Sequence, residues 1–182
     1  MTTSAAIFST ALDAVDAAVA AVPASLPVVK GLDDESLLAM QRRIAASRRA
    51  RDACASLVAG EVAFRSRPDL GYQGLAQKNG FSSPQKLVQS ATGSTGRDAS
   101  TLVAVGAMVH EARAAELADP TTGELPVEYR VAEPWLAAVG AAVAAGTLSV
   151  DAAKAIKSGL GEPSVDATGA GESAEDLAGA VE

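Results

Sequence analysis

A long stretch without proline limits the possible folds more than any other feature of the sequence. No proline occurs between Pro27 and Pro68, and three consecutive acids, residues 33–35, lie near its beginning. Acids are favoured at a helix N-terminus, where they cap free amides and face the positive end of the helix dipole; a pair of catalytic acids is the alternative. We predict one helix from this cluster to about Arg65, because apolar side chains recur in it at helical spacing: Leu37, Met40, Ile44, Cys54, Val58 and Val62.

The composition favours helices elsewhere as well. Alanine is abundant, whereas aromatic residues are limited to three Phe, two Tyr and one Trp, and runs of β-branched residues are nearly absent. We therefore expect an all-α, multi-helix fold packed through small residues, with one long Arg-rich helix and a helix-turn-helix-like unit.

Three segments are predicted. Residues 1–30 form an amphipathic helix over 4–22 and a proline linker, and this helix docks on the rest of the chain; residues 31–160 form the helical core domain; residues 161–182 are a Gly-rich acidic segment and the start of a further helix. In the core domain, Pro134 opens a helix that Trp135 anchors and Gly146 closes. Ser149 caps the next helix, whose buried side is Val150, Ala153 and Ile156.

The N-terminus and the single cysteine bear on localisation. Cys54 has no cysteine partner, no Lys or Arg precedes Lys30, and Asp13 and Asp16 interrupt the first apolar stretch. We predict a cytoplasmic protein with no export signal, no membrane span and no internal disulfide.

Positive charge is concentrated in the middle of the chain. The net charge is −7, yet residues 42–97 hold ten Lys and Arg against three acids, an excess of seven positive charges. One interpretation is an outward-facing surface that binds anions. The other is that many of the charges in this segment pair with one another or with the acidic parts of the chain on either side of it.

The basic segment contains the most specific local pattern. A short helix should end at Asn79-Gly80, and a second should begin with Ser83 as its cap and Pro84 at its first position, which is the layout of a helix-turn-helix. An ordinary helical hairpin shares this layout. Gln85, Lys86 and Gln89 on the second helix can contact bases or phosphates. The candidate DNA-binding residues are Arg48, Arg49, Lys78, Gln85, Lys86 and Arg97.

Two further features yield no catalytic site. The turn Gly93–Arg97 lacks the lysine of a phosphate-binding loop, so we expect it to begin a helix, with Ser94 or Asp98 as the cap. His110 is the only histidine, and we expect it to hydrogen bond at the surface or between helices. No catalytic residue, metal ligand or cofactor is expected in this chain.

Several segments together resemble a known family. Gly74-Leu75-Ala76, Gly80-Phe81-Ser82, the helix entering at Pro84 and the stretch from Ala144 to Ala152 are similar to the actinobacterial helical domain of unknown function number 222. This resemblance, from about Leu32 onward, implies a helical domain that often precedes an HNH nuclease module. Members often have a His just after the Leu-Ser turn, where this chain has Asp151-Ala152, and the histidines and asparagine of an HNH site are absent.

We therefore expect a non-catalytic accessory domain of an HNH-endonuclease-like protein that contacts double-stranded DNA through the basic segment. A longer parent protein would carry the metal-dependent nuclease, and the chain ends like a fragment or a shortened relative. The alternative is a protein-interaction or oligomerisation module, in which the Arg-rich helix pairs with an acidic helix of the same or another chain. In that case the partner is a helical protein or a second copy.

Overall fold

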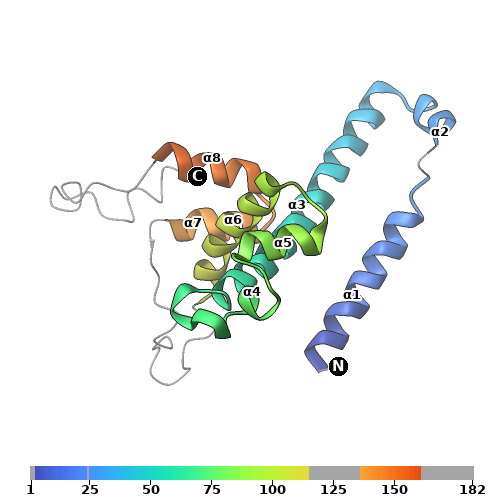
Figure 1. The fold of residues 1–182 in the computed structure, drawn as a ribbon. Coiled ribbons are helices and arrows are strands. Elements are labelled where there is room, and N and C mark those ends of the chain that lie inside the picture. Colours follow the sequence, from blue (N-terminus) through green and yellow to red (C-terminus); the bar gives the residue numbers. More distant parts are fainter. Residues whose placement is uncertain (1–2, 24, 115–135, 161–182) are drawn as a thin grey trace, which may run out of the picture. The chain divides into compact units, whose positions relative to one another are not determined.

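The computed structural model describes residues 3–23, 25–114 and 136–160, and every element in these ranges is helical (Figure 1). The prediction of an all-α fold with one long helix is confirmed. The elements are α1 (Thr3–Ala20), α2 (Leu26–Lys30), α3 (Asp34–Phe64), the 3₁₀ helix η1 (Pro68–Gln73), α4 (Leu75–Lys78), α5 (Pro84–Thr92), α6 (Gly96–Ala114), α7 (Ala137–Ala144) and α8 (Val150–Leu160).

The chain divides into two compact units, Met1–Ile44 and Ala45–Glu182, and the division falls inside α3. In the first unit α1 confirms the helix predicted over residues 4–22. The predicted proline linker is partly helical, because α2 carries Pro27 in its first turn, where a missing amide donor costs nothing. The docking of α1 on the rest of the chain stays a prediction.

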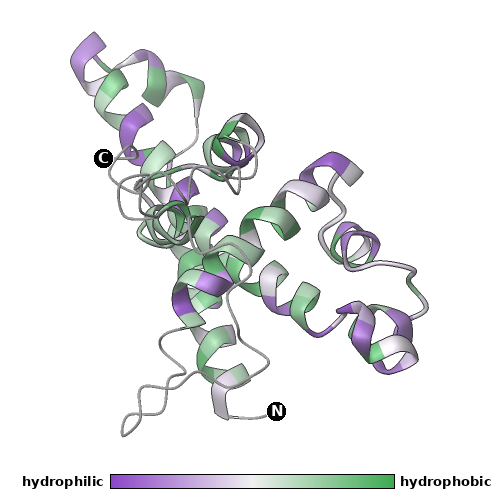
Figure 2. Ribbon diagram, turned by 90° about the vertical axis from the view of Figure 1, so that its left-hand side faces the viewer, coloured by the Kyte–Doolittle hydropathy of each residue, from purple (hydrophilic) through white to green (hydrophobic). Residues whose placement is uncertain are grey.

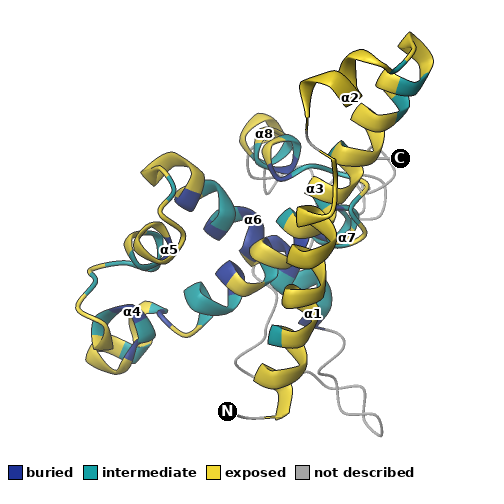
Figure 3. Ribbon diagram, turned by 90° about the vertical axis from the view of Figure 1, so that its right-hand side faces the viewer, coloured by how far each residue is buried: buried dark blue, intermediate teal, exposed yellow. Residues whose placement is uncertain are grey.

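No residue is buried in the part of the first unit that the structure describes. Exposed residues cover α1 almost throughout (Figure 3). By length and composition alone, α1 is also apolar enough to cross a membrane, although it contains Asp13 and Asp16. The cytoplasmic location and the absence of a membrane partner therefore stay predictions.

The long helix α3 begins as its acidic residues predict. The Ser36 amide donates a hydrogen bond to Oδ1 of Asp33 at 2.7 Å, so Asp33 caps the helix. Hydrogen bonds from the backbone and side chain of Ser36 hold the pKa of the Asp33 carboxyl below its ordinary value. The helix ends at Phe64, one residue from the predicted end.

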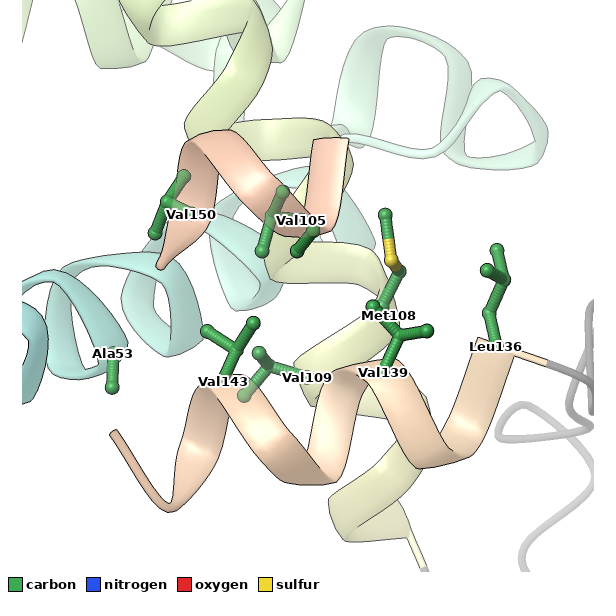
Figure 4. Close-up of a cluster of buried hydrophobic side chains, with 9 residues drawn as sticks. Ala53, Val105, Met108, Val109, Leu136, Val139, Val143 and Val150 are labelled. Carbon is green, nitrogen blue, oxygen red and sulfur yellow. The ribbon is translucent and has the colours of Figure 1, made fainter. Parts of the chain in front are cut away.

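The second unit is built around α6, which packs against α5, α7 and α8. Hydrophilic and hydrophobic residues alternate along the helices (Figure 2). The buried hydrophobic residues of this unit form two clusters. Figure 4 shows the larger cluster, whose buried members come from α3, α6, α7 with the adjacent Leu136, and α8: Ala53, Val105, Met108, Val109, Leu136, Val139, Val143, Val150 and Ala153. The smaller one joins α3, α5 and α6 through Ala59, Val88, Ala99 and Val103.

Glycines allow the helix backbones of this unit to touch. A Cβ atom built at Gly106 of α6 would lie 2.3 Å from the carbonyl oxygen of Ser56 in α3, and one at Gly60 of α3 would lie 2.3 Å from the carbonyl oxygen of Gly106. A Cβ at Gly140 of α7 would meet the carbonyl oxygen of Met108 at 2.2 Å. Real side chains cannot approach backbone so closely, so α3, α6 and α7 can cross here only through glycine. The expectation of packing through small residues is confirmed.

The turn between α7 and α8 follows the predicted signals. Gly146 has a left-handed φ of 71°, and the Thr147 amide donates to the carbonyl oxygen of Ala142, as in a Schellman cap. The Ser149 hydroxyl then accepts a hydrogen bond from the Ala152 amide and caps α8. Val150 and Ala153 are buried and Ile156 packs on the core, as predicted. Pro134, the Trp135 anchor and the segment 161–182 lie outside the described residues.

Candidate nucleic-acid interface

The helix-turn-helix-like layout is present between α4 and α5. The turn uses Gly80 at a left-handed φ of 78°, and the Ser83 hydroxyl accepts a hydrogen bond from the Lys86 amide at the start of α5. Pro84 occupies the first turn of α5. The predicted end of one helix at Asn79-Gly80 and the predicted cap of the next at Ser83 are both confirmed.

Hydrogen bonds fix α4 to the end of α3. The Leu75 amide donates to the carbonyl oxygen of Arg65 at 2.7 Å, and the Ala76 amide donates to the buried hydroxyl of Ser66 at 3.0 Å. The Phe81 amide donates back to the carbonyl oxygen of Ala76 at 2.9 Å. Because these amides are satisfied within the fold, α4 and its turn form a defined support for α5.

The helix after the Gly93 turn begins differently from the prediction. The Asp98 amide donates to the hydroxyl of Thr95 at 3.2 Å, so Thr95 caps α6 and neither Ser94 nor Asp98 does. The Ser94 hydroxyl instead forms a hydrogen bond with the Thr92 hydroxyl at 2.7 Å. The physical reason is that Gly93 ends α5 with a left-handed φ of 64°, which leaves Thr95 at the position before the first helical residue.

Four of the six candidate residues lie on α4, α5 and the start of α6. Lys78 is on the last turn of α4, Lys86 is on the first turn of α5, and Arg97 is on the first turn of α6; all three side chains are exposed, and Gln85 is half-buried. In the part of the chain that the structure describes, no carboxylate forms an ion pair with these three cations. We call Lys78, Gln85, Lys86, Gln89 and Arg97 together the α4–α6 surface.

The other two candidates, both on α3, have contacts of their own. Nε of Arg49 donates a hydrogen bond to the carbonyl oxygen of Gly146 at 2.9 Å, across the turn between α7 and α8. Nε of Arg48 lies 3.6 Å from Oδ2 of Asp52, one turn further along α3. The structure thus brings Arg49 to the α7–α8 turn and gives Arg48 an acidic neighbour.

Each of the three acids of the basic segment pairs with one arginine. Besides the pair of Arg48 with Asp52, Arg65 pairs with Glu61 and Arg67 pairs with Asp69. The predicted pairing of cations with acids is confirmed for these three arginines, and anion binding by the remaining cations stays a prediction. Three cations are paired locally, while Lys78, Lys86 and Arg97 have no such pair within the described ranges.

A second polar cluster joins α3 and α6 around His110. Its Nε2 atom lies 2.9 Å from Oε2 of Glu61, and its side chain is 15% exposed. The His110 ring stacks on Phe64 with the ring centroids 5.1 Å apart, and the Arg67 guanidinium lies 4.5 Å from the centre of the Phe64 ring. The prediction that His110 hydrogen bonds between helices is confirmed.

Opposing effects act on the Glu61 carboxyl. Burial raises its pKa, but hydrogen bonds from Arg65 and His110 and their charges outweigh burial, so the pKa is lowered from its ordinary value of 4.5. A cavity of about 410 Å³ adjoins this carboxyl. The described residues that line it are Leu57, Val58, Glu61, Val62, Arg65, Leu75, His110 and Arg113. None of these is a Ser, Thr or Cys that could act as a nucleophile. No group of three metal-ligating side chains occurs among the residues that the structure describes.

Sequence reasoning did not identify the partner of His110. Glu61 lies 49 residues earlier in the chain, and only the crossing of α3 and α6 at Gly60 and Gly106 brings the two side chains together. The sequence signal that could have indicated this crossing is a glycine, since Gly60 interrupts an otherwise helical pattern.

Comparisons of this chain with protein-family models, with curated proteins and with solved structures found no match. The resemblance to the domain of unknown function rests on the quoted residues and stays a prediction.

Proposed function

We propose that this chain is a non-catalytic helical accessory domain that contacts double-stranded DNA through the α4–α6 surface. The observation that carries the proposal is the exposure of Lys78, Lys86 and Arg97 on three successive helices, with no ion pair to a carboxylate within the described residues. Cations of this kind attract phosphates and release counterions when they bind them.

The local geometry supports the same function. The α4–turn–α5 unit has the order and caps of a helix-turn-helix, in which the second helix enters the major groove. Arg49 and Arg48 are assigned to the fold instead, because Arg49 bonds the Gly146 carbonyl and Arg48 lies beside Asp52.

The wider biological role follows from the resemblance. As an accessory domain of an HNH-endonuclease-like protein, the chain would hold DNA while a nuclease module on the parent protein, with its own metal, cleaves it. Cleavage is assigned to that module, because an HNH site needs more than one histidine and this chain has only His110.

A salt titration tests the proposal. Fluorescence anisotropy with a labelled duplex should show binding at low salt that weakens linearly on a logarithmic scale as salt rises, with a slope of about −0.9 for each phosphate contact. Absence of binding at low salt would contradict the proposal. A protein that keeps its affinity at high salt would also contradict it, because phosphate contacts would then not drive the association.

A second candidate function, self-association, is favoured by the first unit. Its apolar residues Phe8, Leu12, Val15 and Val19 lie on one face of α1 at alternating spacings of four and three residues and are 38–47% exposed. Because α1 has two acids and no cation, a second copy's Arg-rich α3 complements it in charge. Light scattering should then show dimers that Leu12→Asp dissociates; monomers at every concentration would exclude this function.

A further inference from the structure

The orientation of α5 decides which of its side chains can reach a ligand. Val88 is 6% exposed and packs in the smaller hydrophobic cluster with α3 and α6, and Leu87 is half-buried. The opposite face, at helical spacing, consists of the exposed residues Lys86, Gln89 and Ser90. This face points away from the core of the second unit.

Gln89 joins the exposed face of α5 to the start of α6. A Cβ atom built at Gly96 would lie 3.6 Å from Oε1 of Gln89, so the Gln89 amide group lies beside the first turn of α6. Arg97 is the next residue on that turn, and Lys86 is one turn before Gln89 on α5. The amide group therefore lies one turn from Lys86 on the exposed face of α5 and beside the turn of α6 that carries Arg97.

The hydrogen-bonding capacity of the Gln89 side chain is not used within the fold. In the described part of the chain, no hydrogen bond involves its amide nitrogen or its Oε1 atom, whereas nearby side chains such as Thr92 and Ser94 are engaged. A side-chain amide has donors and an acceptor, so it can bind a partner that offers both at once.

Adenine offers such a pair in the major groove, where N7 accepts and the N6 amino group donates, and glutamine binds the two atoms together. Lys86, one turn away on α5, and Arg97, on the adjoining first turn of α6, suit phosphates, which fix the position of the helix but carry no sequence information. We infer that Gln89 reads an adenine in double-stranded DNA, so that binding depends on sequence as well as on charge. This inference rests on the proposed function, since it needs α5 to lie in the groove.

The test is selection of bound sequences from a random duplex library at low salt, followed by sequencing, with the full chain and two variants. The wild type should favour an A·T pair at one position by about tenfold over the other pairs. Gln89→Ala should lose this preference while it still binds duplexes. Gln41→Ala, which removes an exposed glutamine from α3, should keep the preference. Thermal melting should show both variants as stable as the wild type, because both side chains are exposed.

The outcomes separate the inference from the proposed function. Binding without any base preference, or a preference that Gln89→Ala leaves unchanged, would overturn the inference and leave the proposed function standing. Failure of the wild type to retain any duplex would overturn the proposed function itself, and the inference with it.

Discussion

Cations of the same segment have two different environments. On α3, Arg49 bonds a backbone carbonyl of the α7–α8 turn, and Arg65, the residue after α3, bonds Glu61 one turn earlier, so both guanidinium groups are engaged within the chain. On the α4–α6 surface, Lys86 and Arg97 are exposed and have no ion pair in the described part of the chain. The difference shows that charge density along a sequence does not by itself identify a binding surface, because some cations of a basic segment are engaged by acceptors of the same chain.

The stability of the second unit should depend most strongly on the glycines where its helices cross. Gly106→Ala should destabilise the protein by about 3 kcal/mol, because the new methyl group would lie 2.3 Å from the Ser56 carbonyl oxygen and the two helices would have to separate. Urea unfolding followed by circular dichroism measures the loss.

Gly159→Ala is the matched control for this substitution. Gly159 also lies in a helix, α8, but a Cβ atom there meets nothing within 4 Å. This variant should be unchanged or more stable by roughly 0.5 kcal/mol, since alanine is the better helix former. Equal destabilisation of the two variants would refute the close crossing of α3 and α6.

Replacing Arg49 should have the second largest effect on the free energy of unfolding. Arg49→Ala should cost about 1.5 kcal/mol, because it removes a charged hydrogen bond to the part-buried Gly146 carbonyl. Arg49→Lys keeps the charge but not the geometry of Nε, so it should also be destabilised, with duplex affinity close to that of the wild type. If instead Arg49→Lys keeps full stability and both variants differ mainly in DNA binding, then Arg49 belongs to the binding surface.

The acid dependence of the Glu61 pair should be the smallest effect. Since the folded pKa of Glu61 lies below its ordinary value of 4.5, the stability that it contributes is present above that pH and is lost as the pH falls through the folded value. Glu61→Gln should therefore be less stable than the wild type at pH 6 by less than about 1 kcal/mol, because solvent screens this partly exposed carboxylate.

The difference in stability between the wild type and Glu61→Gln should shrink as the pH falls below 4.5, as thermal melting at several pH values can show. A constant difference at all pH values would mean that the charge of Glu61 does not matter.

Local patterns predicted much of this fold, because caps and turns depend on neighbouring residues. Asp33, Ser83 and Ser149 cap helices as their sequence positions indicate, and Gly80 and Gly146 adopt the left-handed conformation expected of them. Thr95 replaced the predicted caps of α6, since several hydroxyl and carboxyl groups in a short turn compete for the same amides.

The candidate site was less predictable. Which cations are engaged depends on contacts between distant segments, such as Arg49 with Gly146, 97 residues apart. Nothing in the local sequence distinguishes that arginine from Arg48 beside it.

Two charge-matched variants test whether the α4–α6 surface binds the duplex. Each removes three exposed positive charges without an ion pair in the described residues: Lys78, Lys86 and Arg97 in one variant, and Arg42, Arg43 and Arg51 in the other, all replaced by Ala. The measurement is the salt dependence of duplex DNA binding by both variants and the wild type. The first variant should lose most of its affinity, with a slope shallower by about 2.7, while the second should keep a slope near that of the wild type. Equal losses in the two variants would show that total charge rather than the α4–α6 surface governs binding, and would refute the proposed interface.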